Sequence, residues 1–292
     1  MASKGISAKH ESSSCSEALG ISCRVYASLA TGVNTALIFV HGFSGDQERT
    51  WRKFQSLLDQ REEFASWDAY FVGYPSTREQ IAATAANLTR FIRHVYPRPP
   101  AEIFERHIWI GRTQKILQLR EYATGYTRLV LVGHSQGGVV IRKAVLEAAK
   151  EAIQAGTVGT DPLCNAELVL FAPAIFGMFL SGWKGFAAAT SAWKIVGPVL
   201  GGSPSYKELQ PNSQFLTRLE NETVRLASDS QEKVAGLAAR IAWASRDKIV
   251  EGGQRYQCDP EYIFLDEGHT SVCKPGSAAD DPVLFVLGEE AK

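Results

Sequence analysis

The sequence predicts an α/β fold, with a mostly parallel central sheet, helices on both faces and a cap or lid insertion. Short, fully apolar runs alternate along the chain with longer segments whose apolar residues recur at helical spacing. This alternation is typical of a parallel sheet that helices cover on both faces. The chain has 292 residues, of which 45% are hydrophobic and 21% charged. That composition is sufficient for one large domain with a full core.

The first half of the chain contains two predicted strand and helix pairs. "TALIFVHG" at 35–42 is an apolar run that ends in glycine, and "WDAYFVGYPS" at 67–76 is a second strand that proline stops. Between them, 50–59 has apolar residues on one helical face: Trp51, Phe54, Leu57 and Leu58. A second helix follows, and the spacing of Thr77 and Gln80 suggests a capping box at its start.

The second half continues the alternation around two insertions. The segment 96–127 is polar and starts near prolines, and we expect an insertion that is helical in its later part. Further strands are predicted at 129–134, 166–174, 239–250 and 261–272, and further helices at 136–152 and, broken at Pro211, 205–220. We expect residues 1–16 to form a disordered tail. The remaining residues, 17–292, form one domain with a cap or lid at about 174–237.

Charge and cysteine content argue against several classes of protein. Lys plus Arg and Asp plus Glu both number 31, and no basic stripe is evident, so no nucleic-acid partner is expected. Five widely spaced cysteines without a CxxC pair argue against a zinc site or a disulfide framework. The polar, serine-rich N-terminus lacks the apolar stretch of a secretory signal, so a cytoplasmic location is expected.

The segment 174–202 is strongly apolar, but Lys184 and Lys194 interrupt it. No uncharged run reaches the roughly 18 residues that a spanning helix needs. The segment is therefore predicted to be a lid or an interfacial surface, which would give peripheral membrane contact.

A serine stands between glycines where a predicted strand meets a predicted helix, in Gly133-His134-Ser135-Gln136-Gly137. A sharp turn at such a junction exposes a serine nucleophile, and glycines at the flanking positions avoid clashes with the strand and helix. A glycine-rich turn with a serine N-cap is the alternative. The strand before the motif and the helix after it favour Ser135 as a nucleophile.

A serine nucleophile needs a base, and the chain order Ser, acid, His selects it. Of six histidines, only His269 follows Ser135, in a loop after a predicted strand. The acid must lie between the two. Asp247, in "IAWASRDKIV", follows a strand and fits best; Asp266, three residues before the histidine, is the main competitor, and Glu251 a weaker one.

An oxyanion requires two backbone N–H groups directed at one point. Gln136, after the nucleophile and at a helix N-terminus, would supply one. Phe43, in the loop "FVHGFSGD" after the first apolar run, would supply the other, with Ser44 as the second choice.

With these residues in order, the chain resembles the α/β-hydrolase superfamily and, within it, lipase-like serine esterases. "VHGFSGD", "LVGHSQGG", "LQPNSQFLTRL", "RDKIV" and "GHTSVCKP" are similar to the pattern of the GPI-inositol-deacylase-like group and related serine esterases. The resemblance covers roughly 35–275. It implies the α/β-hydrolase fold, a triad of Ser135, Asp247 and His269, and oxyanion donors at Phe43 and Gln136. The insertions at 96–127 and 174–202 depart from the pattern and leave the substrate open.

The predicted function is hydrolysis of carboxylic esters, on a small-molecule or lipid substrate, through an acyl-enzyme and without a metal or an organic cofactor. Aromatic and apolar residues of the cap could bind an acyl chain or simply pack: Phe176, Met178, Phe179 and Trp183. The same triad would serve acyl transfer or cleavage of thioesters or amides. A non-catalytic interaction module is a further alternative.

Overall fold

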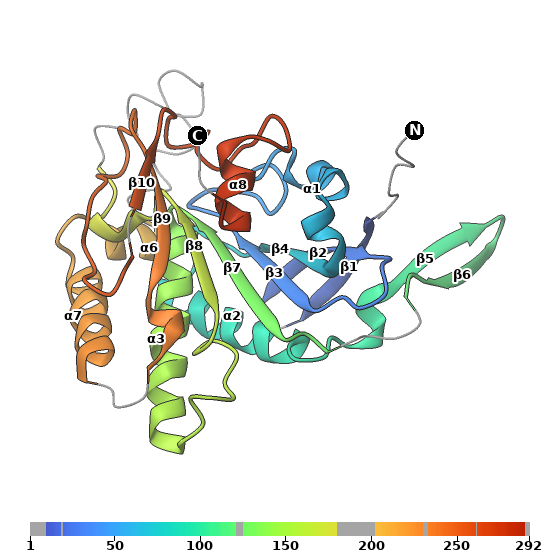
Figure 1. Ribbon diagram of the computed structural model, residues 1–292, viewed down its shortest axis with the longest axis horizontal. Coiled ribbons are helices and arrows are strands. Elements are labelled where there is room, and N and C mark those ends of the chain that lie inside the picture. The colour runs from blue at the N-terminus through green and yellow to red at the C-terminus, as the bar shows by residue number, and fades with distance from the viewer. Residues whose placement is uncertain are drawn as a thin grey trace.

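The computed structural model describes residues 10–18, 20–120, 125–179, 202–229, 233–260 and 262–289. Eight strands form one sheet in the order β1-β2-β4-β3-β7-β8-β9-β10, and β5 and β6 form a separate two-stranded sheet (Figure 1). The strands are β1 (His10–Ala18), β2 (Ile21–Ser28), β3 (Thr35–Val40), β4 (Trp67–Gly73), β5 (Glu105–Ile110), β6 (Thr113–Gln118), β7 (Arg128–His134), β8 (Glu167–Phe171), β9 (Ala239–Ala244) and β10 (Tyr262–Leu265).

The six strands from β4 to β10 in the order of the large sheet run parallel, and β1 and β2 extend one edge antiparallel. β3 and β7 lie next to each other in the middle, with Val40 level with Gly133. The loops after these two strands therefore meet at one end of the sheet, as expected for the reactive end of a parallel sheet. The predicted α/β-hydrolase fold is confirmed.

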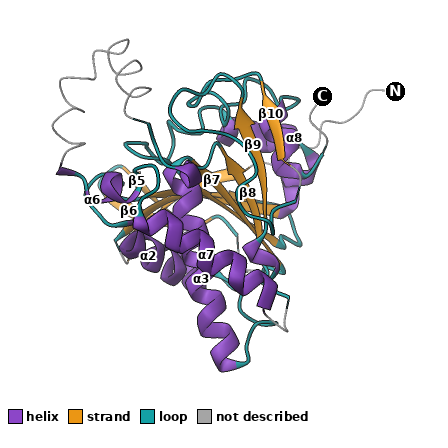
Figure 2. Cartoon of the chain, turned by 90° about the vertical axis from the view of Figure 1, so that its left-hand side faces the viewer, coloured by secondary structure: helices purple, strands orange, loops and turns teal. Residues whose placement is uncertain are grey.

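Helices cover both faces of the sheet, with α2, α3 and α7 on one side and α8 on the other (Figure 2). The α-helices are α1 (Phe54–Leu57), α2 (Ile81–Val95), α3 (Gln136–Ala155), α6 (Pro204–Glu208), α7 (Gln214–Asp229) and α8 (Asp281–Leu287). Short 3-10 turns are η1 (Leu58–Gln60), η2 (Glu62–Ser66), η3 (Ala101–Phe104), η4 (Ala174–Phe176) and η5 (Ala235–Leu237).

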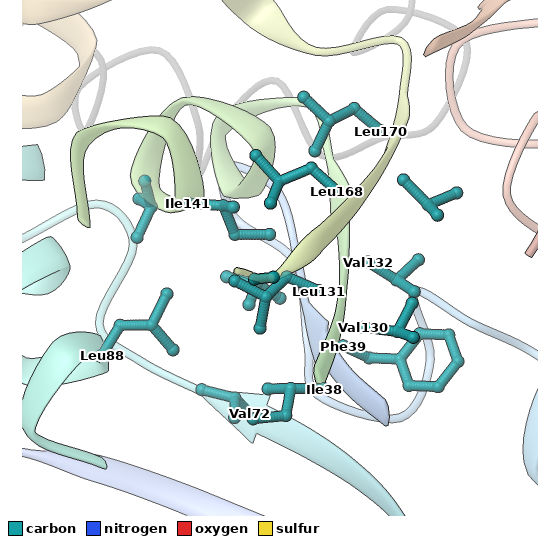
Figure 3. Close-up of a cluster of buried hydrophobic side chains, with 14 of the residues drawn as sticks. Ile38, Phe39, Val72, Leu88, Val130, Leu131, Val132, Ile141, Leu168 and Leu170 are labelled. Atoms are coloured by element: carbon teal, nitrogen blue, oxygen red, sulfur yellow. The ribbon is translucent and has the colours of Figure 1, made fainter. Parts of the chain in front are cut away.

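Fully buried side chains of the central strands form the core between these layers. Every residue of β3 and β4 is buried, which explains why their sequences are apolar without alternation. Figure 3 shows side chains from both faces of this sheet together with Leu88 of α2 and Ile141 of α3. On the face of the sheet opposite α2 and α3, Phe39 stacks on Phe71 with the ring centroids 4.5 Å apart. Phe39 also contacts Phe54 of α1.

The predicted helical insertion at 96–127 is wrong, because the segment contains a β-hairpin. β5 and β6 pair antiparallel, and Gly111, with φ +64°, is the first residue of a two-residue turn between them. Glycine at that position suits a type II′ turn. The apolar residues on either side of "GR" are adjacent rather than alternating, as Ile116 and Leu117 show, so the sequence has no clear strand period here.

The prediction of a disordered tail over 1–16 is wrong for residues 10–16, which belong to β1. The backbone of β1 pairs with β2 from His10 opposite Ser28 onward. The His10 backbone N–H also donates to Asp59 Oδ1 at 2.7 Å. Backbone pairing requires no apolar pattern, so a serine-rich segment can form an edge strand. Residues 1–9 lie outside the described part of the chain.

The predicted capping box at the start of α2 is also wrong. Gln80 is the N-cap residue, and its side chain makes no capping hydrogen bond. The backbone N–H of Ile81 donates instead to Glu208 Oε2 at 2.7 Å. A carboxylate from α6 therefore satisfies this helix end.

The predicted cap or lid is described only in part. α6 and α7 match the two predicted helices on either side of Pro211, whereas 180–201 lies outside the described residues. Within the described ranges, none of the helices has the length and hydropathy needed to cross a bilayer.

Candidate active site

Ser135 occupies a sharp turn between β7 and α3, with φ 54° and ψ −119°. Few non-glycine residues adopt positive φ, and such a conformation costs about 1–3 kcal/mol and persists only where the surroundings enforce it. The surroundings do so here, since the Ser135 N–H donates to the Phe171 carbonyl at 3.0 Å and its carbonyl accepts from Ala174 N–H at 3.1 Å.

The glycines of the motif permit close backbone approach. A Cβ atom at Gly137 would lie 2.1 Å from the Val40 carbonyl oxygen, and one at Gly133 would lie 2.8 Å from the Gly138 backbone. A Cβ at Gly42 would lie 2.9 Å from Ser135 Cβ. The loop after β3 and the nucleophile turn are therefore in direct contact.

The structure brings Ser135, His269 and Asp247 together as one hydrogen-bonded chain. Ser135 Oγ lies 3.0 Å from His269 Nε2, and Asp247 Oδ2 lies 2.7 Å from His269 Nδ1. Because a carboxylate only accepts, Nδ1–H donates to Asp247 and Nε2 is left to accept from the serine hydroxyl. The imidazole and carboxylate side chains are both buried.

The two competing acids do not contact the histidine. The Asp266 side chain is 87% exposed and pairs with Arg246 at 3.0 Å, and Glu251 is exposed. Asp247 is held in place by two further bonds, because its Oδ1 accepts from the backbone N–H groups of Ile249 and Val250 at 2.8 and 3.1 Å.

A cavity of about 310 Å³ opens beside the serine. Its lining includes Ser135, His269, Gly42, Phe43 and Ser44, so the loop predicted to supply an oxyanion donor borders the nucleophile. Asp46, Arg49, Lys274 and Ile249 also line it, which gives the cavity walls that carry charges of both signs and an apolar part.

The structure distinguishes between Phe43 and Ser44, the two oxyanion donors predicted in the loop after β3. The Ser44 N–H donates to Ser76 Oγ at 3.0 Å, so it is already engaged. Phe43 is buried and lines the cavity. Gln136 is the first residue of α3, where N–H groups have no intrahelical acceptor.

Ser76 hydrogen-bonds to both segments that carry the predicted donors, and the sequence alone did not point to it. Its carbonyl accepts from Gln136 Nε2 at 3.1 Å and from Ser205 Oγ of α6 at 2.6 Å, in addition to the bond from Ser44 to its hydroxyl. Ser76 and Ser205 are buried. The "PST" after the second predicted strand was the available signal, because it too lies at the carboxyl end of a strand.

The predicted acyl-binding residues do not line this cavity where they are described. Phe176 packs near Trp243 with ring centroids 6.0 Å apart, and Met178 is buried. Phe179 is exposed and its N–H donates to the Ile249 carbonyl at 2.8 Å, next to the cavity wall. Trp183 lies outside the described residues.

Two buried histidines, His134 and His41, hydrogen-bond to backbone groups next to the site. His134 Nε2 lies 2.8 Å from the His269 carbonyl oxygen and donates to it. His41 donates from Nδ1 to the Gly42 carbonyl at 2.8 Å, and its Nε2 accepts from the Tyr74 N–H at 3.3 Å. Burial lowers the pKa of His41 and, with the neighbouring His269, lowers the pKa of His134 well below its usual value.

These shifts predict that mild acid destabilises the fold. Below about pH 6.5, the usual pKa of a free histidine, the unfolded histidines bind protons that the folded ones do not. The free energy of unfolding therefore falls as the pH falls. Each histidine contributes at most about 1 kcal/mol over the first pH unit below 6.5, because the unfolded imidazole is only half protonated at the start of that range. Urea unfolding at a series of pH values between 7.5 and 5.5 measures this.

A matched variant separates the two histidines. His134→Gln removes one titrating group and retains a donor toward the His269 carbonyl, so it should reduce the pH slope. Carboxylates titrate below this window in the unfolded chain. A wild-type stability that is flat from pH 7.5 to 5.5 would contradict the assignment of neutral, buried imidazoles.

Comparison with known proteins identifies the family. The profile described as "Alpha/beta hydrolase family" matches residues 37–273. Protein SERAC1 of Danio rerio is 22% identical over 256 residues, which cover 83% of this chain and 36% of that protein. The chain therefore spans about a third of the length of that relative.

A solved structure has the same fold. The mature form of the Bacillus licheniformis lipase BlEst2 aligns with a TM-score of 0.51 at 14% identity, covering 89% of this chain and 94% of the lipase. The predicted superfamily is thus confirmed, and the similarity to Protein SERAC1 fits the narrower resemblance. Since the family match extends from β3 through the loop that carries His269, the chain belongs to the alpha/beta hydrolase family.

Proposed function

We propose that the protein is a serine esterase that cleaves carboxylic esters through an acyl-enzyme. One observation carries the proposal: the continuous hydrogen-bonded chain from Ser135 through His269 to Asp247 at the wall of an open cavity. The lipase fold of the structural relative is consistent with ester chemistry.

The first half-reaction makes the acyl-enzyme. His269 Nε2 takes the Ser135 hydroxyl proton as Oγ bonds to the ester carbonyl carbon, and the carbonyl oxygen becomes an oxyanion. The backbone N–H groups of Phe43 and Gln136 stabilise that charge. When the intermediate collapses, the ester C–O bond breaks and His269 returns the proton to the leaving alcohol.

The second half-reaction releases the acid. Water replaces the alcohol, His269 takes its proton, and the hydroxyl oxygen bonds to the acyl carbon. Collapse breaks the bond to Ser135 Oγ, which recovers the proton from His269. Asp247 keeps its negative charge throughout and stabilises the imidazolium that forms twice in the cycle.

Fluorophosphonate labelling read by intact mass tests the proposal. The wild type should gain one adduct, because an activated serine attacks phosphorus and expels fluoride, and Ser135→Ala should gain none. Ser245→Ala is the matched control, since that serine is exposed and its hydroxyl donates to Asp266 Oδ1 at 3.2 Å, not to a histidine. It should label like the wild type.

Two results would contradict the proposal. A wild type that does not label lacks an activated serine, and a non-catalytic module then becomes the better explanation. A labelled wild type that cleaves a matched thioester or amide faster than the p-nitrophenyl ester of the same acid would transfer the assignment to those substrates.

A further inference from the structure

The β5–β6 hairpin extends away from the body of the protein (Figure 1). Three of its apolar side chains are largely exposed: Ile110 at 55%, Ile116 at 60% and Leu117 at 47%. All six residues of β6 are exposed. A two-stranded hairpin alone in water is at best marginally stable, and the described side chains of Ile110 and β6 are exposed to solvent rather than covered.

The exposed apolar residues occupy both faces of the hairpin. Residues opposite each other in the register share a face, and faces alternate along a strand. Ile110 pairs with Thr113, so Ile110, Thr113 and Leu117 lie on one face. Ile116, one residue from Leu117, lies on the other. A protein partner with a flat surface would cover one face only, whereas a fluid lipid phase can surround both.

The charges of the hairpin have one sign near its tip. Arg112 is in the turn and Lys115 in β6, and both are exposed. Neither forms an ion pair with a described residue, and the sequence from 106 to 120 contains no aspartate or glutamate. Cations beside exposed apolar side chains are the combination that binds interfaces of anionic lipid.

We propose that the β5–β6 hairpin docks the protein on an anionic lipid membrane. Ile110, Ile116 and Leu117 enter the boundary between headgroups and acyl chains. Arg112 and Lys115 contact the lipid phosphates.

The hairpin and the active site are at opposite ends of the sheet. Arg120, just after β6, bonds to Asp68 Oδ2 at 2.7 Å near the start of β4. β7 then runs from Arg128 to His134, next to Ser135, a span of about 20 Å. Docking therefore leaves the cavity at Ser135 remote from the hairpin, so lipid binding and ester cleavage can be measured independently.

Cosedimentation of the full chain with vesicles tests the proposal. We expect binding to vesicles of phosphatidylcholine with phosphatidylglycerol and much weaker binding to phosphatidylcholine alone. Arg112→Gln with Lys115→Gln should weaken the binding about 25-fold, at about fivefold for each cation. The triple variant Ile110→Ser, Ile116→Ser and Leu117→Ser should weaken it tenfold or more, an order-of-magnitude expectation.

The control variants make the same kinds of substitution on surfaces outside the hairpin. Phe264 is 54% exposed and Arg225 of α7 is exposed, so Phe264→Ser and Arg225→Gln should bind vesicles like the wild type. All the substituted side chains are exposed, and an unchanged thermal midpoint would verify that each variant folds.

Three outcomes would overturn the proposal. The wild type does not bind the anionic vesicles, or the hairpin variants bind as well as the wild type. Light scattering without lipid finds a dimer that the triple variant abolishes, in which case a second copy of the chain covers the hairpin. Fluorophosphonate labelling of each variant shows separately whether Ser135 remains active, so neither result depends on the other.

Discussion

Asp247→Asn is expected to lower kcat about 10⁴-fold while leaving the fold intact. Asp247 Oδ1 accepts from the Ile249 and Val250 N–H groups. The asparagine oxygen would retain these bonds, which directs its NH₂ group toward His269 Nδ1. That nitrogen must then accept, so Nε2 carries the proton and cannot take the one on Ser135.

The control is Asp266, the other candidate for the acid of the triad. Asp266→Asn changes the same group three residues from His269, but the Asp266 carboxylate faces solvent and Arg246. Its kcat should stay close to the wild-type value with p-nitrophenyl esters. A large loss in Asp266→Asn together with near-normal turnover in Asp247→Asn would reverse the assignment.

Arg142→Met is expected to lower the free energy of unfolding by about 3–5 kcal/mol, because it leaves a buried carboxylate without its cation. Arg142 Nη2 lies 2.5 Å from Asp259 Oδ2, and both side chains are almost fully buried. The guanidinium also lies over the ring of Tyr256 at 4.1 Å. The pair links α3 to the loop before β10.

An exposed ion pair supplies the comparison. Arg218 of α7 is 77% exposed and pairs with Glu222, which also bonds to Lys150, so Arg218→Met should cost less than about 1 kcal/mol. Adding Asp259→Asn to Arg142→Met should restore part of the loss, because the uncompensated charge is removed. Urea unfolding of all three variants measures the differences. An Arg142→Met cost as small as that of Arg218→Met would mean that the pair is solvated in solution.

The residues of the site could be predicted where chain order alone was sufficient. Ser135 was recognisable because the glycines around it are required by backbone contacts such as that of Gly137 with Val40. His269 followed from being the sole histidine after the serine. The strands β3, β4 and β7 were predictable because burial on both faces leaves a continuous apolar run.

The sequence favoured Asp247 as the acid, and the tertiary structure excluded its competitor Asp266. Asp247 and Asp266 both follow strands, and Asp266 is nearer to His269 in sequence. Only the folded backbone directs one carboxylate inward to the imidazole and the other to solvent, and sequence distance does not specify side-chain direction. Ser76 was missed for the same reason, since its contacts join three separate segments.

The parallel core, the nucleophile and the base could therefore be predicted from the order of residues, because burial and close backbone approach restrict which residue types can stand at those positions. The edge strand β1 and the β5–β6 hairpin are evident only in the folded chain, which also excludes Asp266 as the partner of His269. β1 and the hairpin are held by backbone hydrogen bonds, which almost any side chain permits, and the acid is selected by a contact between residues 22 positions apart. Such contacts are therefore difficult to predict from the order of residues.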